Sequence, residues 1–222
     1  MSKLISVHEL DKKKYKALGL GDEWVPYIGQ PETKLRMIVW GDSGQGKTTF
    51  VIQLCMELTK IGKVYYNSAE EGEGSSLQNN MRRNDVAGKC KAGAFMIGDR
   101  DSFEKMVSRL AQPRHRIKFV VIDSLQYLKL TEDQYKYLIE TFPSLGIIMI
   151  SWADSSGNPK GQHARAIRYM VDIKTYVKKG LATTDSRFGS TIPYRVMEWD
   201  EVEKPAPAKL LKASTEQIEL AL

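Results

Sequence analysis

One short stretch, residues 41–49, limits what this chain can fold into more than any other part of it. The stretch consists of Gly41, Asp42, Ser43, Gly44, Gln45, Gly46, Lys47, Thr48 and Thr49. It matches the phosphate-binding pattern G-x-x-x-x-G-K-[ST] at every fixed position. An apolar run over residues 34–40 precedes it, and apolar residues at helical spacing follow it. Because this motif requires a strand before it and a helix after it, the flanks favour an α/β fold built around the loop.

The residue types of this stretch suit a phosphate chain. Glycines let backbone N–H groups turn toward an anion, and the start of a helix adds unpaired N–H groups and a positive dipole end. We expect Lys47 to reach the β- and γ-phosphates of ATP, and the Thr48 hydroxyl to hold Mg²⁺. The whole stretch is therefore predicted to bind nucleotide.

Acidic residues follow two of the predicted strands. A strand over residues 63–67 leads into a cluster that contains Glu70, Glu71 and Glu73. A carboxylate there can orient and deprotonate a water molecule aimed at the γ-phosphate, or the cluster is an ordinary solvated turn. A second apolar strand ends in Asp123, which we expect to bind Mg²⁺ through water or through Thr48.

The rest of the chain alternates between strand and helix patterns. Helices are predicted over residues 75–92, 102–110, 132–142 and 209–222. Further strands are predicted over residues 94–97, 117–123, 146–152, 170–177, 181–185 and 194–199, with a turn-rich loop over 154–162. This order predicts a mainly parallel twisted sheet with helices on both faces, extended by antiparallel C-terminal strands.

The length of 222 residues is that of one domain with short appendages. We divide it into an N-terminal lead-in (1–33), a core (34–200) and a C-terminal tail (201–222). The net charge of +6 is compatible with a polyanionic partner without requiring one. The lysine-rich run at residues 12–16 is either a solvated helix face or a binding patch.

Two cysteines, Cys55 and Cys90, form neither a disulfide framework nor a zinc pattern. Cys55 falls on the apolar face of the helix after the loop, so we expect a buried thiol. No apolar run reaches transmembrane length. These features favour a cytoplasmic protein with no membrane partner.

Taken in order, these motifs resemble the RecA-like ATPase core, closest to its RadA recombinase and DnaB helicase branches. The similarity covers about residues 34–199, and its more specific pieces are VIDSLQ at 121–126 and SRFG at 186–189. The resemblance implies that Glu70 is the catalytic glutamate and Asp123 the Mg²⁺ aspartate. It also implies that Arg187 reaches into a neighbouring subunit's ATP site, and hence a homo-oligomer, either a ring or a filament.

Three positions depart from that family's pattern. Trp152 stands where a Gln or His usually senses the γ-phosphate, and an indole cannot accept a hydrogen bond. Ser155 and Asp185 stand where lysines are usual. The nucleotide site looks intact, whereas the coupling of hydrolysis to DNA looks altered. The chain is similar to a bare core, as in phage-type RecA-like single-strand annealing proteins.

Three functions compete at this point. The leading hypothesis is an ATP-hydrolysing oligomer that acts on single-stranded DNA in recombination, annealing or repair. Its DNA contacts would lie after Tyr127 and over residues 154–168, where Lys160, Arg165 and Arg168 can pair with phosphates; the bland alternative is a solvated loop. The second hypothesis is a DnaB-like helicase or loader subunit. The third is a nucleotide-gated binding module with little turnover, which Trp152 favours.

Overall fold

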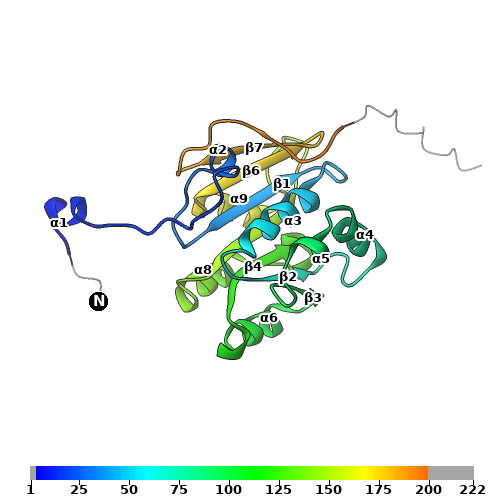
Figure 1. Cartoon of the computed structure of the whole chain (residues 1–222), viewed down its shortest axis with the longest axis horizontal. Helices are drawn as coiled ribbons and strands as arrows, with labels where there is room; N and C mark the ends of the chain where they lie inside the picture. Colours follow the sequence, from blue (N-terminus) through cyan, green and yellow to red (C-terminus); the bar gives the residue numbers. More distant parts are fainter. Residues whose placement is uncertain (1–3, 200–222) are drawn as a thin grey trace, which may run out of the picture.

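Strands β1 to β8 form one sheet in the order β3-β2-β4-β5-β1-β6-β7-β8, in a computed structural model that describes residues 4–199 (Figure 1). The parallel strands are β1 (Arg36–Gly41), β2 (Lys63–Ser68), β3 (Phe95–Asp99), β4 (Ile117–Asp123), β5 (Gly146–Trp152) and β6 (Ile173–Lys178). The antiparallel extension consists of β7 (Leu181–Ser186) and β8 (Tyr194–Arg195). The predicted fold class is confirmed, including the antiparallel C-terminal strands.

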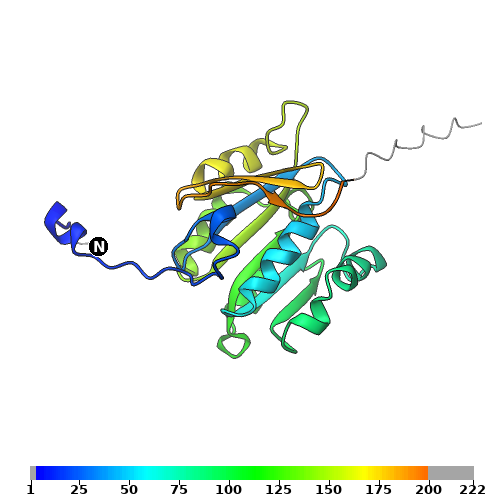
Figure 2. The same ribbon diagram turned by 45° about the horizontal axis from the view of Figure 1, so that its top comes forward.

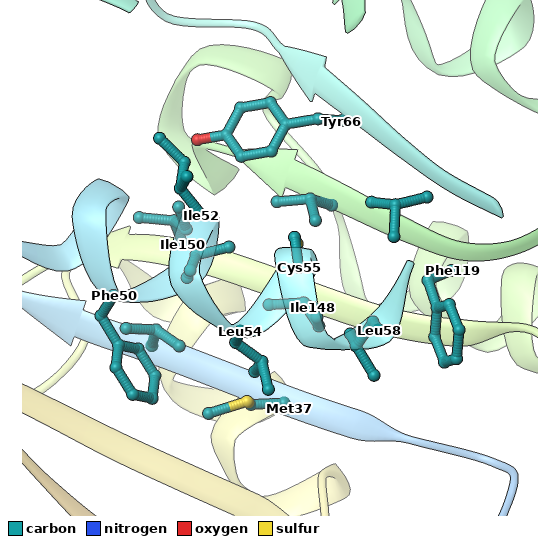
Figure 3. Close-up of a cluster of buried hydrophobic side chains, with 14 of the residues drawn as sticks. Met37, Phe50, Ile52, Leu54, Cys55, Leu58, Tyr66, Phe119, Ile148 and Ile150 are labelled. Carbon is teal, nitrogen blue, oxygen red and sulfur yellow. The ribbon is translucent and has the colours of Figure 1, made fainter. Parts of the chain in front are cut away.

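One face of the sheet is covered by α3 (Lys47–Leu58), with α4 (Ser75–Arg83), α5 (Val86–Lys89) and α2 (Val25–Ile28) beside it. Figure 3 shows α3 lying over the strands, with Phe50, Leu54 and Leu58 among the buried side chains around it. Met37 of β1 and Ile148 of β5 meet this helix from the sheet side. Cys55 is buried in this cluster, as predicted, and burial raises the pKa of its thiol.

The opposite face is covered by α6 (Phe103–Leu110), α7 (Leu125–Leu128), α8 (Glu132–Thr141) and α9 (Gln162–Met170), with a 3-10 turn η1 (Pro113–His115) before β4. Tyr135 and Leu138 of α8 and Ile167 of α9 pack here against Ile38 and Met149 of the central strands. Because helices cover both faces, β1 is buried along its whole length. The carboxyl ends of the parallel strands remain available for a site.

The segment before β1 divides into two parts. Leu18, Trp24 and Ile28 are buried in the core cluster around α3, and the Trp24 ring stacks on Tyr194 with centroids 4.9 Å apart. Residues 4–17 are exposed, and they include α1 (Val7–Asp11), which stands clear of the body (Figure 2). The lysine-rich run at 12–16 lies in this exposed part, mostly outside α1. The predicted boundary at residue 34 stays a prediction, although packing with the core begins before it.

Three of the predicted elements were wrong in extent. The predicted helix over 75–92 is interrupted at Asp85, which has a φ of 54°. The strand predicted over 170–177 begins at Ile173, because α9 occupies the residues before it. The strand predicted over 194–199 is limited to β8.

Two further predictions concern the end and the environment of the chain. The helix predicted over 209–222 lies outside the described residues. Within residues 4–199 no helix is both long and apolar enough to cross a membrane.

Candidate functional site

The loop between β1 and α3 is shaped by backbone contacts that glycine permits. A Cβ on Gly41 would lie 2.2 Å from the carbonyl oxygen of Val177, and Gly46 has a φ of 100°. The turn after β6 holds the loop from outside, because the Lys179 N–H donates to Gln45 Oε1 at 2.6 Å and the Gly180 N–H donates to the Gln45 carbonyl at 3.2 Å. The loop therefore depends on the close approach of another strand, which excludes a side chain at position 41.

Lys47 begins α3, and its side chain bends back over the loop. The residue is 8% exposed, and its Nζ donates to the Asp42 carbonyl at 2.7 Å. Burial lowers the pKa of this ammonium group, while the nearby carboxylates Asp123 and Glu70 act in the opposite direction. Gly46 gives α3 no side-chain cap, which suits a helix start that receives an anion.

Asp123 ends β4, beside the start of α3. Its Oδ2 lies 3.5 Å from Thr48 Oγ1 and accepts a hydrogen bond from the Tyr66 hydroxyl. Burial raises the pKa of Asp123 to about 6; the Tyr66 hydrogen bond and Lys47 oppose this shift, and Glu70 reinforces it. The predicted Mg²⁺ residues, Thr48 and Asp123, are thus brought together.

Mg²⁺ fits this donor set. A hydroxyl and a carboxylate are hard oxygen ligands, and Mg²⁺ is usually held by one or two such groups together with phosphates and water. Within residues 4–199, no group of three or more His, Cys, Asp or Glu side chains is placed to hold a metal ion. Phosphate oxygens of a nucleotide would therefore be needed to complete the coordination.

Glu70 follows β2 and lies against the end of β4. Its N–H donates to the Asp123 carbonyl at 2.9 Å. Its Oε2 accepts two hydrogen bonds, from Ser124 Oγ at 3.2 Å and from Trp152 Nε1 at 3.3 Å. The sequence correctly showed that Trp152 cannot be an acceptor, but it did not reveal that the indole is a donor to Glu70.

One cavity of about 610 Å³ joins these groups. Lys47, Thr48, Glu70, Asp123 and Trp152 line it together with residues that the sequence analysis did not select: Gln53, Asn80, Arg83, Asn84, Val196 and Met197. The polar members of α4 recur at helical spacing after the acidic cluster, which was an available signal. Nothing in the sequence links Val196 to Gln53, whose Nε2 donates to the Val196 carbonyl at 3.1 Å.

The three cations predicted to bind DNA lie around the loop after β5, and each has a partner within the chain. Lys160 Nζ lies 5.3 Å from the centroid of the Trp152 ring. Arg165 forms an ion pair with Asp154 at 2.5 Å. Arg168 donates to Asn158 Oδ1 at 2.8 Å and lies 4.8 Å from the centroid of the Trp40 ring.

The predicted loop over 154–168 is corrected in its second half. It ends at Gly161, and α9 carries Arg165 and Arg168. The helix was missed because its apolar face is short, with Ala164 and Ile167 as its buried residues, and because Gly161 at the N-cap has no side chain to announce a helix start.

Arg187 is not brought to this cavity. Its N–H donates to the Asp172 carbonyl, and its guanidinium lies 3.2 Å from the Asp172 carboxylate. Because Ser186 is level with Ile173, and Ile173 with Met37, Arg187 lies at the amino end of β1, whereas the phosphate loop lies at the carboxyl end. Asp185 stands beside it on β7, 3.5 Å from Lys174 Nζ.

Comparison with known proteins places the architecture. No protein-family model and no curated protein matches the chain. Among solved structures, the chain is similar to the ATPase domain of a DnaB-like helicase, with a TM-score of 0.50 and 14% identity over 65% of this chain and 69% of that one. The chain has the RecA-like P-loop NTPase fold, and at this level of identity the likeness concerns the fold alone.

Proposed function

We propose that this protein binds and hydrolyses Mg-ATP and acts on single-stranded DNA in recombination, annealing or repair. The observation that carries the nucleotide part is the convergence of Lys47, Thr48, Asp123 and Glu70 on one cavity. These groups come from the loop after β1, the start of α3, the end of β4 and the turn after β2. That combination supplies a phosphate cradle, two oxygen ligands and a base.

Each residue has a role that follows from its position. The backbone of residues 41–46 and the Lys47 ammonium group hold the phosphates, and Thr48 and Asp123 hold Mg²⁺, which neutralises phosphate charge when it is bound. Glu70 accepts a proton from the attacking water. Two donors on Glu70 Oε2 fix the direction of its carboxylate, and we assign this positioning role to Ser124 and Trp152.

DNA contact is proposed for the surface formed by Lys160, Arg165 and Arg168. The loop with these cations follows β5, the strand that ends in Trp152 beside Glu70. Since Arg165 is already paired with Asp154, a DNA phosphate has to share or replace that carboxylate. The support for DNA contact is the gathering of cations at this edge of the sheet.

Assembly into a homo-oligomer is proposed from Arg187. Its place at the far edge of the sheet prevents it from reaching the phosphates bound by its own chain, so a catalytic role requires a second copy. Mixing Arg187→Ala protein with Lys47→Ala protein should restore part of the ATP turnover, because a mixed interface pairs an intact loop with an intact arginine. No restoration on mixing would remove the in-trans role.

The test of the DNA part replaces Lys160, Arg165 and Arg168 together by alanine. Fluorescence anisotropy with a labelled single strand at several salt concentrations should show weaker binding and a shallower salt dependence, since fewer counterions are released. ATP affinity should be unchanged. A parent-like salt slope would move the DNA site elsewhere.

The alternative of a nucleotide-gated module with little turnover is favoured by the engagement of Glu70 with Trp152. Negligible hydrolysis by a protein that binds ATP tightly, with or without single-stranded DNA, would decide for it. The alternative of a helicase or loader subunit would require DNA-stimulated, unidirectional unwinding.

A further inference from the structure

We propose that Tyr169 is a stacking platform for an unpaired base of single-stranded DNA, and that the polar pocket beside it receives the adjoining phosphate. This inference rests on the proposed DNA role and adds the chemistry by which an unpaired strand would be recognised. Lys160, Arg165 and Arg168 alone offer only charge, which a duplex also attracts. An exposed aromatic ring offers a surface that only an unstacked base can cover.

The first supporting observation is the exposure of Tyr169. It lies on α9 and is 77% exposed, the highest value among the large hydrophobic residues over 18–199. The helix itself is anchored, because Ala164 and Ile167 are buried against the sheet. The ring is therefore presented to solvent from a fixed element.

The second observation is a pocket of about 240 Å³ that Tyr169 shares with Arg165, Arg168, Ser156 and Asn158. Two guanidinium groups, a hydroxyl and an amide are donors suited to phosphate oxygens. The pocket and the ring are adjacent, as are a phosphate and a base in a nucleotide.

The two arginines of this pocket are held in different ways. Arg165 is neutralised by Asp154, whose pKa is lowered by hydrogen bonds from the Asn158 N–H and by Arg165. Arg168 contacts the neutral groups Asn158 and Trp40, so its charge is not cancelled by those contacts. Trp40 also fixes the loop, because its Nε1 donates to the Gly157 carbonyl at 2.9 Å. Arg168 is therefore the primary phosphate ligand of the pocket.

A second exposed tyrosine extends the same arrangement. Tyr127 is 51% exposed and meets the Trp152 ring edge-on, with centroids 5.6 Å apart. Lys160 lies over the same Trp152 ring. Aromatic and cationic side chains therefore occur together at both ends of the loop after β5, which is the pattern of surfaces that bind single strands.

The test compares Tyr169→Ala and Tyr169→Phe with the parent. Tyr137→Ala is a matched control, because Tyr137 is an exposed tyrosine on α8, outside this pocket. Dissociation constants are measured for a mixed-sequence single strand and for a strand of equal length that lacks its bases. Tyr169→Ala should weaken binding of the normal strand by about tenfold. Tyr169→Phe and Tyr137→Ala should bind like the parent, and on the abasic strand all four proteins should be equal.

Arg168→Ala provides the contrasting result. It should weaken binding of both strands and reduce the salt dependence, because it removes a phosphate contact rather than a stacking surface. A duplex of the same sequence should bind Tyr169→Ala and parent equally.

Parent-like affinity of Tyr169→Ala for the normal strand would overturn this inference alone. The same holds if Tyr169→Ala loses equal affinity for the abasic strand, or if Tyr169→Phe is as weak as Tyr169→Ala. No binding of the parent to any single strand would overturn the proposed DNA role and this inference together. Thermal melting of each variant confirms that the exposed substitutions leave the fold intact.

Discussion

The phosphate loop and the loop after β5 stand at the same edge of the sheet, but they are held in different ways. The phosphate loop is fixed largely by backbone contacts, such as the approach of Val177 to Gly41 and the two hydrogen bonds of Gln45 to the turn after β6. The loop after β5 is fixed largely by side chains, including the pairs Arg165–Asp154 and Arg168–Asn158. The first is a preformed cradle, and the second consists of contacts that a ligand can exchange.

This difference explains which parts could be read from the sequence. Backbone geometry dictates residue types at fixed spacing, so the glycines and Lys47 form a recognisable pattern. Exchangeable side-chain pairs dictate no spacing, so Lys160, Arg165 and Arg168 could be selected only by charge. Trp152 belongs to both regions, since its indole N–H reaches Glu70 and its ring meets Lys160.

The largest effect is expected from Lys47→Ala. Removing the buried ammonium group leaves the phosphates without their main positive contact, so ATP affinity should fall by about a hundredfold or more and turnover should be lost. Titration with a fluorescent ATP analogue measures this loss, and Lys136→Ala on the exposed face of α8 is the control. Equal affinities of Lys47→Ala and parent would refute the assignment of the phosphate loop.

The next effect is expected from Glu70→Gln. The amide keeps the size of the side chain but cannot take a proton, so turnover should fall by about a hundredfold while ATP binding survives. Steady-state hydrolysis and equilibrium binding of the same preparations separate the two quantities. Hydrolysis at the parent rate would shift the role of the base to Glu71 or Glu73, or remove it.

The smallest effect is expected from Trp152→Phe, which tests the link between the two regions. The ring remains for Lys160 and Tyr127, but Glu70 loses one of its two side-chain hydrogen-bond donors, so turnover should fall by about tenfold with unchanged ATP affinity. Trp40→Phe is the matched control, because the Trp40 indole donates to Gly157 and not to the cavity. A rise in turnover for Trp152→Phe would show that the indole restrains Glu70 instead of positioning it.

Much of the fold could be predicted because the parallel strands are continuous apolar runs and their ends carry Asp123 and the phosphate loop. The parts that escaped depend on contacts between distant residues. The short strand β8 brings Val196 to Gln53 and into the cavity, and no local pattern marks it. The role of Trp152 depends on the distance from β5 to the turn after β2, which only the folded sheet defines.

The strand order has a consequence for the protein while it is being made. β1 carries the phosphate loop and is translated early, but its two neighbours in the sheet, β5 and β6, are translated more than a hundred residues later. Until then the apolar β1 has no partner strand, and the segment that contacts Gly41 does not exist. ATP therefore cannot assist the folding of the first half of the chain on the ribosome. The nascent protein becomes able to bind nucleotide only after its last strands have emerged.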